Sequence, residues 1–183
     1  MIQIYTGDGK GKTTAALGLA LRACGAGKKV ALVQFLKAPK FSEHIAIKKY
    51  KLPIDVFAFG IGFYISSEIP RAVKQSYKIV DNHTVDEHRL AAKKGLLKAE
   101  ELIKSKKYDI VIFDEINVAI GFKLLDTDNV IALLKTVPKN KEIILTGRKA
   151  NAKIKKMADL VTEMKKQKHY FDKGKNARKG IEF

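Results

Sequence analysis

The stretch Thr6-Gly7-Asp8-Gly9-Lys10-Gly11-Lys12-Thr13-Thr14 decides the fold. The apolar run Met1–Tyr5 precedes it, and the helix-like run Ala15–Cys24 follows it. A strand, a glycine-rich turn and a helix in this order are typical of a phosphate-binding loop. Glycines allow the backbone to curl so that successive N–H groups point at phosphate oxygens, and the helix N-terminus adds a partial positive charge.

Individual residues of this loop suit a bound nucleotide. Lys12 is placed to reach the terminal phosphates, and the hydroxyl of Thr13 is placed to hold Mg²⁺. Thr6 departs from the usual pattern, which has a glycine at that position. A tight turn that binds nothing is the alternative, but it does not explain why Gly-Lys-Thr-Thr begins the helix. We therefore predict that the nucleotide-binding residues are Gly7, Asp8, Gly9, Lys10, Gly11, Lys12, Thr13 and Thr14.

Length and composition indicate one globular domain over residues 1–183. The chain is 46% hydrophobic and 30% charged, which is enough apolar material for a substantial core. No apolar run approaches the ~20 residues that span a bilayer, and no secretory signal precedes the loop. The single cysteine, Cys24, excludes an internal disulfide and fits a reducing compartment. We expect a cytoplasmic protein without a membrane partner.

The chain is strongly basic, with 36 Lys and Arg against 19 Asp and Glu and a net charge of +17. Such a charge could indicate a nucleic-acid partner, or a lysine-rich surface on an enzyme that handles phosphates. The basic residues are scattered along the chain, although they are denser over residues 153–179. Scatter favours a solvated lysine face, and we expect no nucleic-acid partner.

Apolar strands alternate with amphipathic helices, which predicts an α/β fold with a mainly parallel sheet flanked by helices. Most predicted strands are short and nearly all apolar, as expected for strands that are covered on both faces. The predicted strands are Ile2–Tyr5, Lys29–Phe35, Asp55–Phe59, Asp109–Phe113, Glu142–Thr146 and Leu160–Met164, and the predicted helices are Thr13–Ala26, Val85–Lys104, Asp128–Thr136 and Ala150–Met157.

Two segments lie outside this pattern. Residues 60–84 are the least regular part of the chain, and a loop of that length is more often functional than structural filler. Residues 165–183 are basic and irregular, which is compatible with a disordered tail. We expect this segment to dock instead, because it contains apolar anchors: Tyr170, Phe171, Ile181 and Phe183.

A second nucleotide signal is the run Asp109-Ile110-Val111-Ile112-Phe113-Asp114-Glu115. Its carboxylates follow an apolar strand, at the edge of an open α/β sheet where ligands bind. Taken alone, they could be ordinary strand-end acids. Together with the phosphate-binding loop they predict a site for Mg²⁺, with Asp114 and Glu115 both as candidate ligands. Spacing alone does not decide which of the two contacts the metal.

Two further segments end predicted strands. Thr146-Gly147-Arg148 could place the planar fork of Arg148 on a phosphate, or could be a turn with an arginine in solvent. Phe59-Gly60-Ile61-Gly62-Phe63-Tyr64 sets glycines beside aromatic rings. Such a loop could lay its rings on a flat ligand, although buried aromatics at a strand end are the simpler interpretation.

Taken together, these segments resemble the phosphate-loop family of ATP:corrinoid adenosyltransferases. The resemblance runs nearly end to end and is weakest across residues 64–90. Thr6 in the position of the first glycine is itself a mark of this family. The matching segments are Tyr5–Ala16, Val33–Lys37, Phe113–Asn117, Thr146–Arg148, Ala158–Met164, Lys168-His169 and Ala177–Glu182.

The resemblance implies a RecA-like P-loop fold and usually a homodimer. It implies transfer of the 5′-deoxyadenosyl group of ATP to Co(I) of a reduced corrinoid, either cobalamin or a precursor, with release of triphosphate. The enzyme class implied is the cob(I)yrinic acid a,c-diamide adenosyltransferase type, supplied with electrons by a flavoprotein. Phe63 and Tyr64 fall where the family crowds the lower face of the corrin with aromatic rings, whereas Ile65 stands where many members have Trp.

The resemblance also implies roles for particular residues. Lys12, Thr13 and Glu115 are expected to be catalytic, with Thr13, Glu115 and Asp114 as ligands of Mg²⁺. Ligand binding is expected at the phosphate-binding loop, Arg148, Asn117, Phe63 and Tyr64. The competing interpretations are a nucleic-acid-dependent RecA-like ATPase, and a nucleotide-binding regulator without chemistry.

Overall fold

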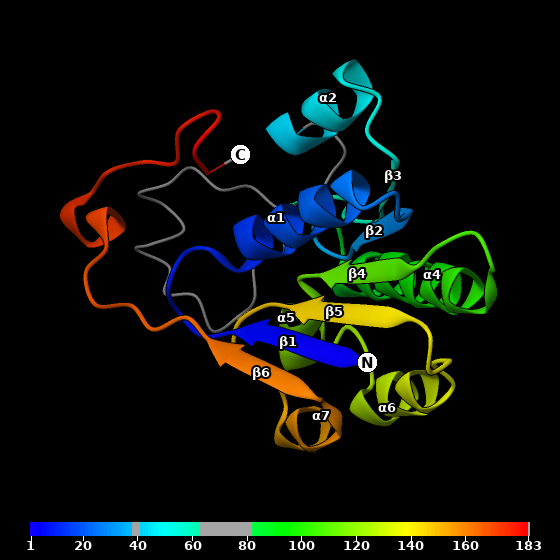
Figure 1. The fold of residues 1–183 in the computed structure, drawn as a ribbon. Helices are drawn as coiled ribbons and strands as arrows, with labels where there is room; N and C mark the ends of the chain where they lie inside the picture. Colours follow the sequence, from blue (N-terminus) through cyan, green and yellow to red (C-terminus); the bar gives the residue numbers. More distant parts are fainter. Residues whose placement is uncertain (38–40, 63–81, 183) are drawn as a thin grey trace.

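The computed structural model describes residues 1–37, 41–62 and 82–182 (Figure 1). Within these residues, six parallel strands form one sheet in the order β3-β2-β4-β5-β1-β6. The strands are β1 (Ile2–Thr6), β2 (Val30–Gln34), β3 (Ile54–Ala58), β4 (Ile110–Asp114), β5 (Glu142–Thr146) and β6 (Leu160–Glu163). The helices are α1 (Lys12–Gly25), α2 (Ser42–Lys49), α4 (Val85–Lys104), α5 (Ile116–Gly121), α6 (Thr127–Lys135) and α7 (Ala152–Met157), followed by the 3₁₀ turn η1 (Tyr170–Lys173).

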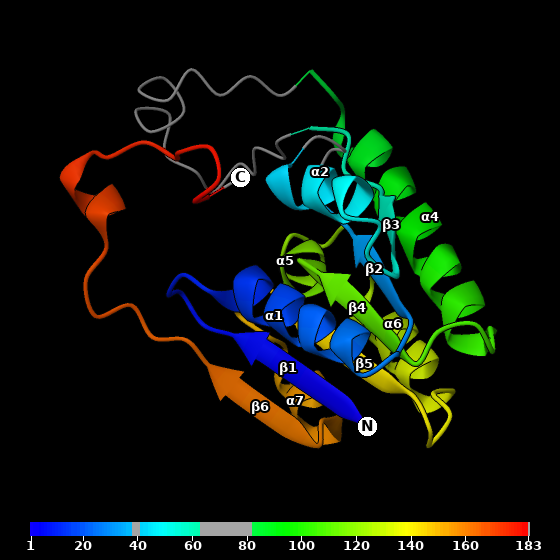
Figure 2. The ribbon, with the colours of Figure 1, turned by 45° about the horizontal axis from the view of Figure 1, so that its top comes forward.

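Helices cover both faces of the sheet, so the core has two halves (Figures 1 and 2). On one face, α1 and α2 pack on the central strands, and Ala16 and Ala20 of α1 lie in one cluster with Leu32 and Ile112. On the other face, α4, α5, α6 and α7 cover a cluster that includes the fully buried Phe113. Alternate residues of each central strand serve the two halves, which explains their continuous apolar sequence.

The helix beginnings follow local sequence signals. Thr84 and Glu87 form a reciprocal capping box at the start of α4. Asp126 caps α6 and Asn151 caps α7, each through a side-chain oxygen that accepts backbone N–H groups. Such caps satisfy amide donors that have no partner within the helix.

The predicted elements are confirmed, with strand ends within one residue and helix ends within two. The helices α2 and α5 were not predicted. The strand β6 is the exception to the coverage on both faces that was expected for most strands, since all four of its residues are exposed. This strand lies at the sheet edge and pairs only with β1 among the described strands.

The parallel sheet brings distant segments to one edge. Gln34 pairs with Asp114, Tyr5 with Thr146, and Thr6 with Glu163 in neighbouring strands. The segments that follow β1, β2, β4, β5 and β6 therefore leave the sheet side by side. This is the edge at which open α/β sheets bind their ligands.

Candidate nucleotide-binding site

The phosphate-binding loop joins β1 to α1 and is curled around Lys12. Gly7 and Gly11 have φ values of 100° and 120°, a region that L side chains rarely adopt. The side chain of Lys12 folds back, and its Nζ donates a hydrogen bond to the Gly9 carbonyl at 2.6 Å. Burial lowers the pKa of Lys12, and the nearby charge of Arg148 lowers it further. The loop therefore holds its lysine inside the curl, where phosphate oxygens would lie.

Two glycines of the loop are required by the chain that follows β6. A Cβ at Gly7 would lie 2.4 Å from the Met164 carbonyl oxygen, and a Cβ at Gly9 would lie 2.7 Å from the same atom. The Gly9 N–H donates a hydrogen bond to that carbonyl at 2.7 Å, and the Met164 N–H donates one to the Thr6 carbonyl at 2.8 Å. Glycine is needed at these two positions because the backbone of Met164 packs directly against the loop. This requirement adds to the one for a curled loop, which the sequence indicates.

Asp114 ties the site together below the loop. Its side chain has no exposed surface, and its Oδ1 accepts hydrogen bonds from the hydroxyls of Thr13 at 2.8 Å and Thr146 at 2.7 Å. Its Oδ2 accepts from the Gln34 amide at 3.1 Å. These bonds link α1, β2, β4 and β5, so the carboxylate fixes the orientation of the Thr13 hydroxyl.

Glu115 is separated from Asp114 by a sharp turn of the backbone. It adopts a left-handed conformation with φ 63°, which starts α5, and its N–H donates to the Thr146 hydroxyl at 2.9 Å. Its side chain lines the cavity above the loop, whereas Asp114 does not. Burial raises the pKa of Glu115, and the neighbouring Asp114 carboxylate raises it further. Of the two acids, Glu115 therefore faces the cavity, whereas Asp114 is buried beneath it.

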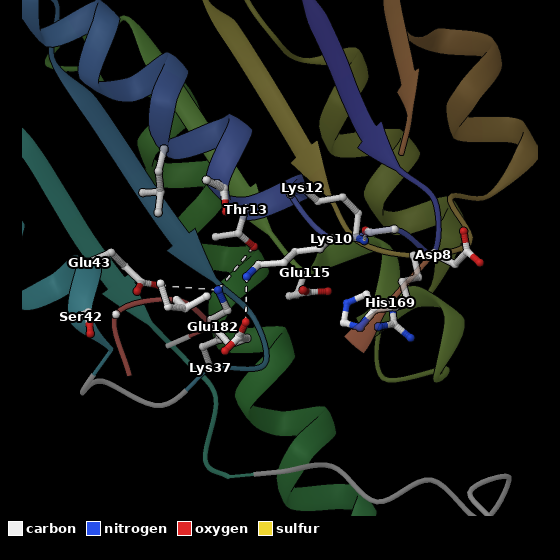
Figure 3. A pocket seen from close by; sticks show the side chains of 17 residues that line it. Asp8, Lys10, Lys12, Thr13, Lys37, Ser42, Glu43, Glu115, His169 and Glu182 are labelled. Carbon is white, nitrogen blue, oxygen red and sulfur yellow. Dashed lines mark hydrogen bonds and ion pairs between the residues drawn. The ribbon is translucent and has the colours of Figure 1, made fainter. Parts of the chain in front are cut away.

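The cavity has a volume of about 500 Å³ and opens above the phosphate-binding loop (Figure 3). Basic side chains reach it from several elements, and such side chains can bind phosphate groups. The residues that line it are Asp8, Gly9, Lys10, Gly11, Lys12, Thr13, Thr14, Leu17, Lys37, Ser42, Glu43, Glu115, Arg148, His169, Gly180, Ile181 and Glu182.

Lys37, which follows β2, points at the middle of this site (Figure 3). Its Nζ lies 3.1 Å from Asp114 Oδ2 and 3.6 Å from Glu43 Oε1, and it donates to the Thr13 hydroxyl at 3.4 Å. Burial lowers the pKa of Lys37, but the Asp114 and Glu43 carboxylates outweigh burial and hold the pKa above its usual value.

The C-terminal segment docks on the loop, as the sequence predicts, but mainly through polar contacts. Lys10 Nζ pairs with Glu182 at 2.8 Å and donates to the Tyr170 hydroxyl at 2.9 Å. The expected apolar anchoring is wrong for Phe171 and Ile181, which are 48% and 54% exposed. Phe183 lies outside the described residues.

Glu182 and Asp8 accept hydrogen bonds that hold the C-terminal segment on the loop. Glu182 also accepts from the Arg178 N–H at 2.6 Å, and Asp8 accepts from the Lys166 N–H at 3.1 Å. The hydrogen bond from Lys10, followed by those from Tyr170 and Arg178, holds the pKa of Glu182 well below its usual range. Both acids therefore remain charged at neutral pH and bind the segment to the basic loop.

Some predicted site residues are not at the cavity. Asn117 is 1% exposed in α5, and neither atom of its amide has a hydrogen-bond partner within the described part of the chain. It packs beneath Gly147, where a Cβ would lie 3.0 Å from the Cβ of Asn117. Phe63 and Tyr64 lie outside the described residues.

Sequence reasoning assigned no role to several lining residues. Lys37, His169 and Glu182 stood inside segments that match the family, but their place beside the loop needs the fold. Ser42 and Glu43 carried no signal, because they belong to α2, a short helix whose buried residue is Ile47.

The chemistry of the donors fits Mg²⁺. The Thr13 hydroxyl and the carboxylates of Asp114, Glu115 and Glu43 offer oxygen atoms, which this hard cation prefers. Over residues 1–37, 41–62 and 82–182, no group of three or more His, Cys, Asp or Glu side chains is arranged to hold a metal ion.

The family model for ATP:corrinoid adenosyltransferases of the BtuR/CobO/CobP type matches residues 1–183. The chain belongs to this family. The corrinoid adenosyltransferase of Escherichia coli K12 is 30% identical over 184 residues, which cover 100% of this chain and 85% of that protein. The corrinoid adenosyltransferase of a Sinorhizobium species is 35% identical over 187 residues, covering 100% of this chain and 80% of that protein.

Solved structures of proteins with little sequence identity share the fold of this adenosyltransferase. The flagellar accessory protein FlaH of Methanocaldococcus jannaschii has a TM-score of 0.53 at 16% identity, over 88% of this chain and 69% of that one. A KaiC-like protein of Pyrococcus horikoshii has a TM-score of 0.53 at 14% identity, over 92% and 73%. The all-parallel sheet and these neighbours show the RecA-like P-loop fold.

Members of this family transfer an adenosyl group to a corrinoid. None of the helices within the described ranges is long and apolar enough to cross a membrane.

Proposed function

We propose that this adenosyltransferase moves the 5′-deoxyadenosyl group of ATP to Co(I) of a reduced corrinoid and releases inorganic triphosphate. The observation that carries the proposal is the cavity above the phosphate-binding loop, where Lys12, Lys37 and Arg148 converge with the start of α1. That positive charge suits the three linked phosphates of ATP. Membership of the family indicates that the acceptor of the adenosyl group is a corrinoid.

The reaction forms one bond and breaks another. Co(I) attacks the 5′ carbon with its electron pair, and the bond between that carbon and the 5′ oxygen breaks. The electrons of the broken bond leave with the oxygen on triphosphate, and cobalt is formally oxidised from Co(I) to Co(III). Since Co(I) is itself a strong nucleophile, the protein needs to hold the carbon in line with cobalt and stabilise the departing charge.

The residues of the cavity suit the departing charge. Loop N–H groups, Lys12, Lys10 and Arg148 would bind the triphosphate, on which negative charge grows as the bond breaks. Lys10 pairs with Glu182 and would be shared with the phosphates. Thr13, Asp114 and Glu115 would hold Mg²⁺. Bound there, the metal would neutralise phosphate charge.

Other features are proposed from the composition of the chain and from the family resemblance. These are a single domain over residues 1–183, a homodimer, a flavoprotein electron donor, cytoplasmic localisation, and an enzyme of the cob(I)yrinic acid a,c-diamide adenosyltransferase type. Phe63 and Tyr64 are proposed to crowd the lower face of the corrin and so ease reduction of Co(II). Replacing Phe63 with Ala should then slow adenosylation from Co(II) more than from pre-reduced Co(I), whereas equal slowing would argue against this role.

The test of the proposed function is anaerobic incubation with MgATP and chemically reduced cobalamin. The account predicts loss of the Co(I) absorbance and growth of a light-sensitive adenosyl–cobalt product. Replacing Lys12 or Thr13 with Ala should lower the rate on the order of 10²–10³-fold. Absence of the product, with ADP release that DNA or RNA stimulates, would replace this proposal by the nucleic-acid-dependent ATPase.

A further inference from the structure

The end of β2 and the start of α2 contribute a polar cluster beside Asp114, and its members Gln34, Glu43 and His44 have no role in the proposed function. The amide of Gln34 donates to Asp114 Oδ2 at 3.1 Å and to Glu43 Oε1 at 3.4 Å. Its carbonyl oxygen lies 2.5 Å from Nε2 of His44. Gln34 has no exposed surface, so the residue at the centre of this network is fully buried.

Lys37 is the cation of this cluster. Its ammonium lies among oxygen atoms of Thr13, Asp114 and Glu43 at 3.1–3.6 Å, and its side chain is 18% exposed. The same Thr13 hydroxyl and Asp114 carboxylate are the groups proposed to bind the metal of MgATP. The ammonium therefore lies beside the same oxygen atoms that are proposed to bind the metal, and it supplies positive charge to them.

The backbone of Lys37 is fixed, so any displacement belongs to the side chain. The Gly60 N–H donates to the Lys37 carbonyl at 3.2 Å. A Cβ at Gly60 would lie 2.4 Å from the Lys37 backbone nitrogen, which leaves no room between the two segments. A lysine side chain with a fixed backbone can still swing its ammonium by several ångströms through its flexible stem.

We propose that Lys37 and the nucleotide's metal ion exchange at this position. In the structure the Lys37 ammonium neutralises Asp114 and Glu43, and without a bound nucleotide it would keep divalent cations out. When the metal enters with ATP, the ammonium moves onto the triphosphate. This inference rests on the proposed function, because it takes the metal of MgATP to bind beside Thr13.

The physical reason is that the two cations exclude each other. A buried carboxylate needs a counter-ion, and Asp114 is fully buried. A divalent cation and an ammonium about 4 Å apart repel each other, and the repulsion is stronger beside a fully buried carboxylate than in bulk water. Exchange lets the carboxylates keep one counter-ion at all times and places an additional positive charge on the leaving triphosphate.

The test is Mn²⁺ binding to the nucleotide-free protein, measured from the electron paramagnetic resonance signal of free Mn²⁺. The variant is Lys37→Met, which keeps the stem and removes the charge. We expect it to bind Mn²⁺ at least about tenfold more tightly than the wild type. Lys10→Met is the matched control, because it removes an equal charge from the same cavity without a contact to Asp114 or Thr13. It should change Mn²⁺ binding less than about threefold.

Equal Mn²⁺ affinity in the wild type, Lys37→Met and Lys10→Met would overturn the proposal. So would an equal gain in both variants, since that result would reflect overall charge. Thermal unfolding followed by circular dichroism checks that the variants are folded, and Lys37→Gln replaces Lys37→Met if the latter is not. No corrinoid or ATP enters this measurement. A gain in Mn²⁺ affinity beside a failed adenosylation assay would therefore sink the proposed function and leave the exchange standing.

Discussion

At the scale of single residues, Gly9 shows how the phosphate-binding loop depends on the far end of the chain. Its N–H donates a hydrogen bond to the Met164 carbonyl, so this donor is engaged within the protein. The phosphates are left to the remaining loop N–H groups and to the basic side chains. Gly9 thus acts as a contact between the loop and the segment after β6.

Replacing Gly9 with Ala should therefore lower stability and loosen that contact. The new Cβ would lie 2.7 Å from the Met164 carbonyl oxygen and 3.0 Å from the Lys165 carbonyl, both of them backbone atoms. Such overpacking costs about 1–3 kcal/mol of unfolding free energy. Chemical denaturation measures the loss. Gly18→Ala is the control, because a Cβ at Gly18 meets nothing within 4 Å, and a loss equal to that of Gly9→Ala would contradict the account.

Burial of Glu115 gives a second prediction at this scale. Because its pKa in the folded protein lies above the ordinary 4.5, the folded state binds the proton more tightly than the unfolded chain does. Stability should then fall as pH rises from 4.5 through the folded pKa. Glu115→Gln removes this loss, so the variant should be more stable than the wild type at pH 7, by a few degrees in melting temperature.

The difference between Glu115→Gln and the wild type should shrink as pH is lowered from 7 to below 4.5, where the carboxyl becomes protonated in both states. Melting temperatures across this pH range measure it. Glu101→Gln, on the exposed face of α4, controls for the loss of one negative charge from a basic protein. A stabilisation by Glu115→Gln that is independent of pH would contradict burial as the cause.

At the scale of elements, the C-terminal segment is held as a wall of the cavity by charge. Lys10, Tyr170, Arg178 and Glu182 form one group, in which the cations of Lys10 and Arg178 lie over the Tyr170 ring at 5.5 and 4.8 Å. Exposed ion pairs are individually weak, but several that share one carboxylate reinforce each other. The segment can thereby stay in place although its apolar side chains are exposed.

Removing that carboxylate should release the segment. In Glu182→Ala we expect amide hydrogen exchange across residues 165–182 to quicken roughly fivefold, because the exposed ion pairs and hydrogen bonds that hold the segment are lost. Glu101→Ala removes a glutamate from the exposed pair with Lys98 on α4 and should leave this segment unchanged. Unchanged exchange in Glu182→Ala would show that other contacts hold the segment.

The elements also show what the sequence could predict. Each strand stands out as a short apolar run between polar turns, so the sheet and the loop after β1 were predictable from local pattern. The helix α5 has six residues and α2 has eight, too few to display a clear periodicity. The exposure of β6 depends on its place at the sheet edge, which its apolar sequence does not reveal.

The site was predictable where a motif and a strand end coincide, as at Thr13, Asp114 and Glu115. It was not predictable where residues meet through the fold alone. Glu43 reaches Lys37 because α2 returns to the end of β2, and no sequence spacing encodes that approach. The requirement for glycine at Gly7 and Gly9 looked like a property of the loop, but Met164, far along the chain, accounts for much of it.

At the scale of the whole molecule, the net charge of +17 raises the question of nucleic acid. The proposed function predicts that DNA and RNA bind weakly and without consequence for ATP. Binding should be lost between about 50 and 200 mM salt, as expected for purely electrostatic contacts. Fluorescence anisotropy of a labelled oligonucleotide measures it. Consumption of ATP should be the same with and without saturating DNA, and stimulation by DNA would contradict this account.

The most direct test of the central claim identifies the phosphate product. Anaerobic turnover with MgATP and Co(I) cobalamin, followed by phosphorus-31 NMR, distinguishes triphosphate from ADP and phosphate. The account predicts one triphosphate for each adenosyl–cobalt product formed, because the bond at the 5′ carbon is the one that breaks. ADP with phosphate, in the absence of an adenosyl–cobalt product, would show that the loop cleaves ATP at the γ-phosphate and would contradict the proposed reaction.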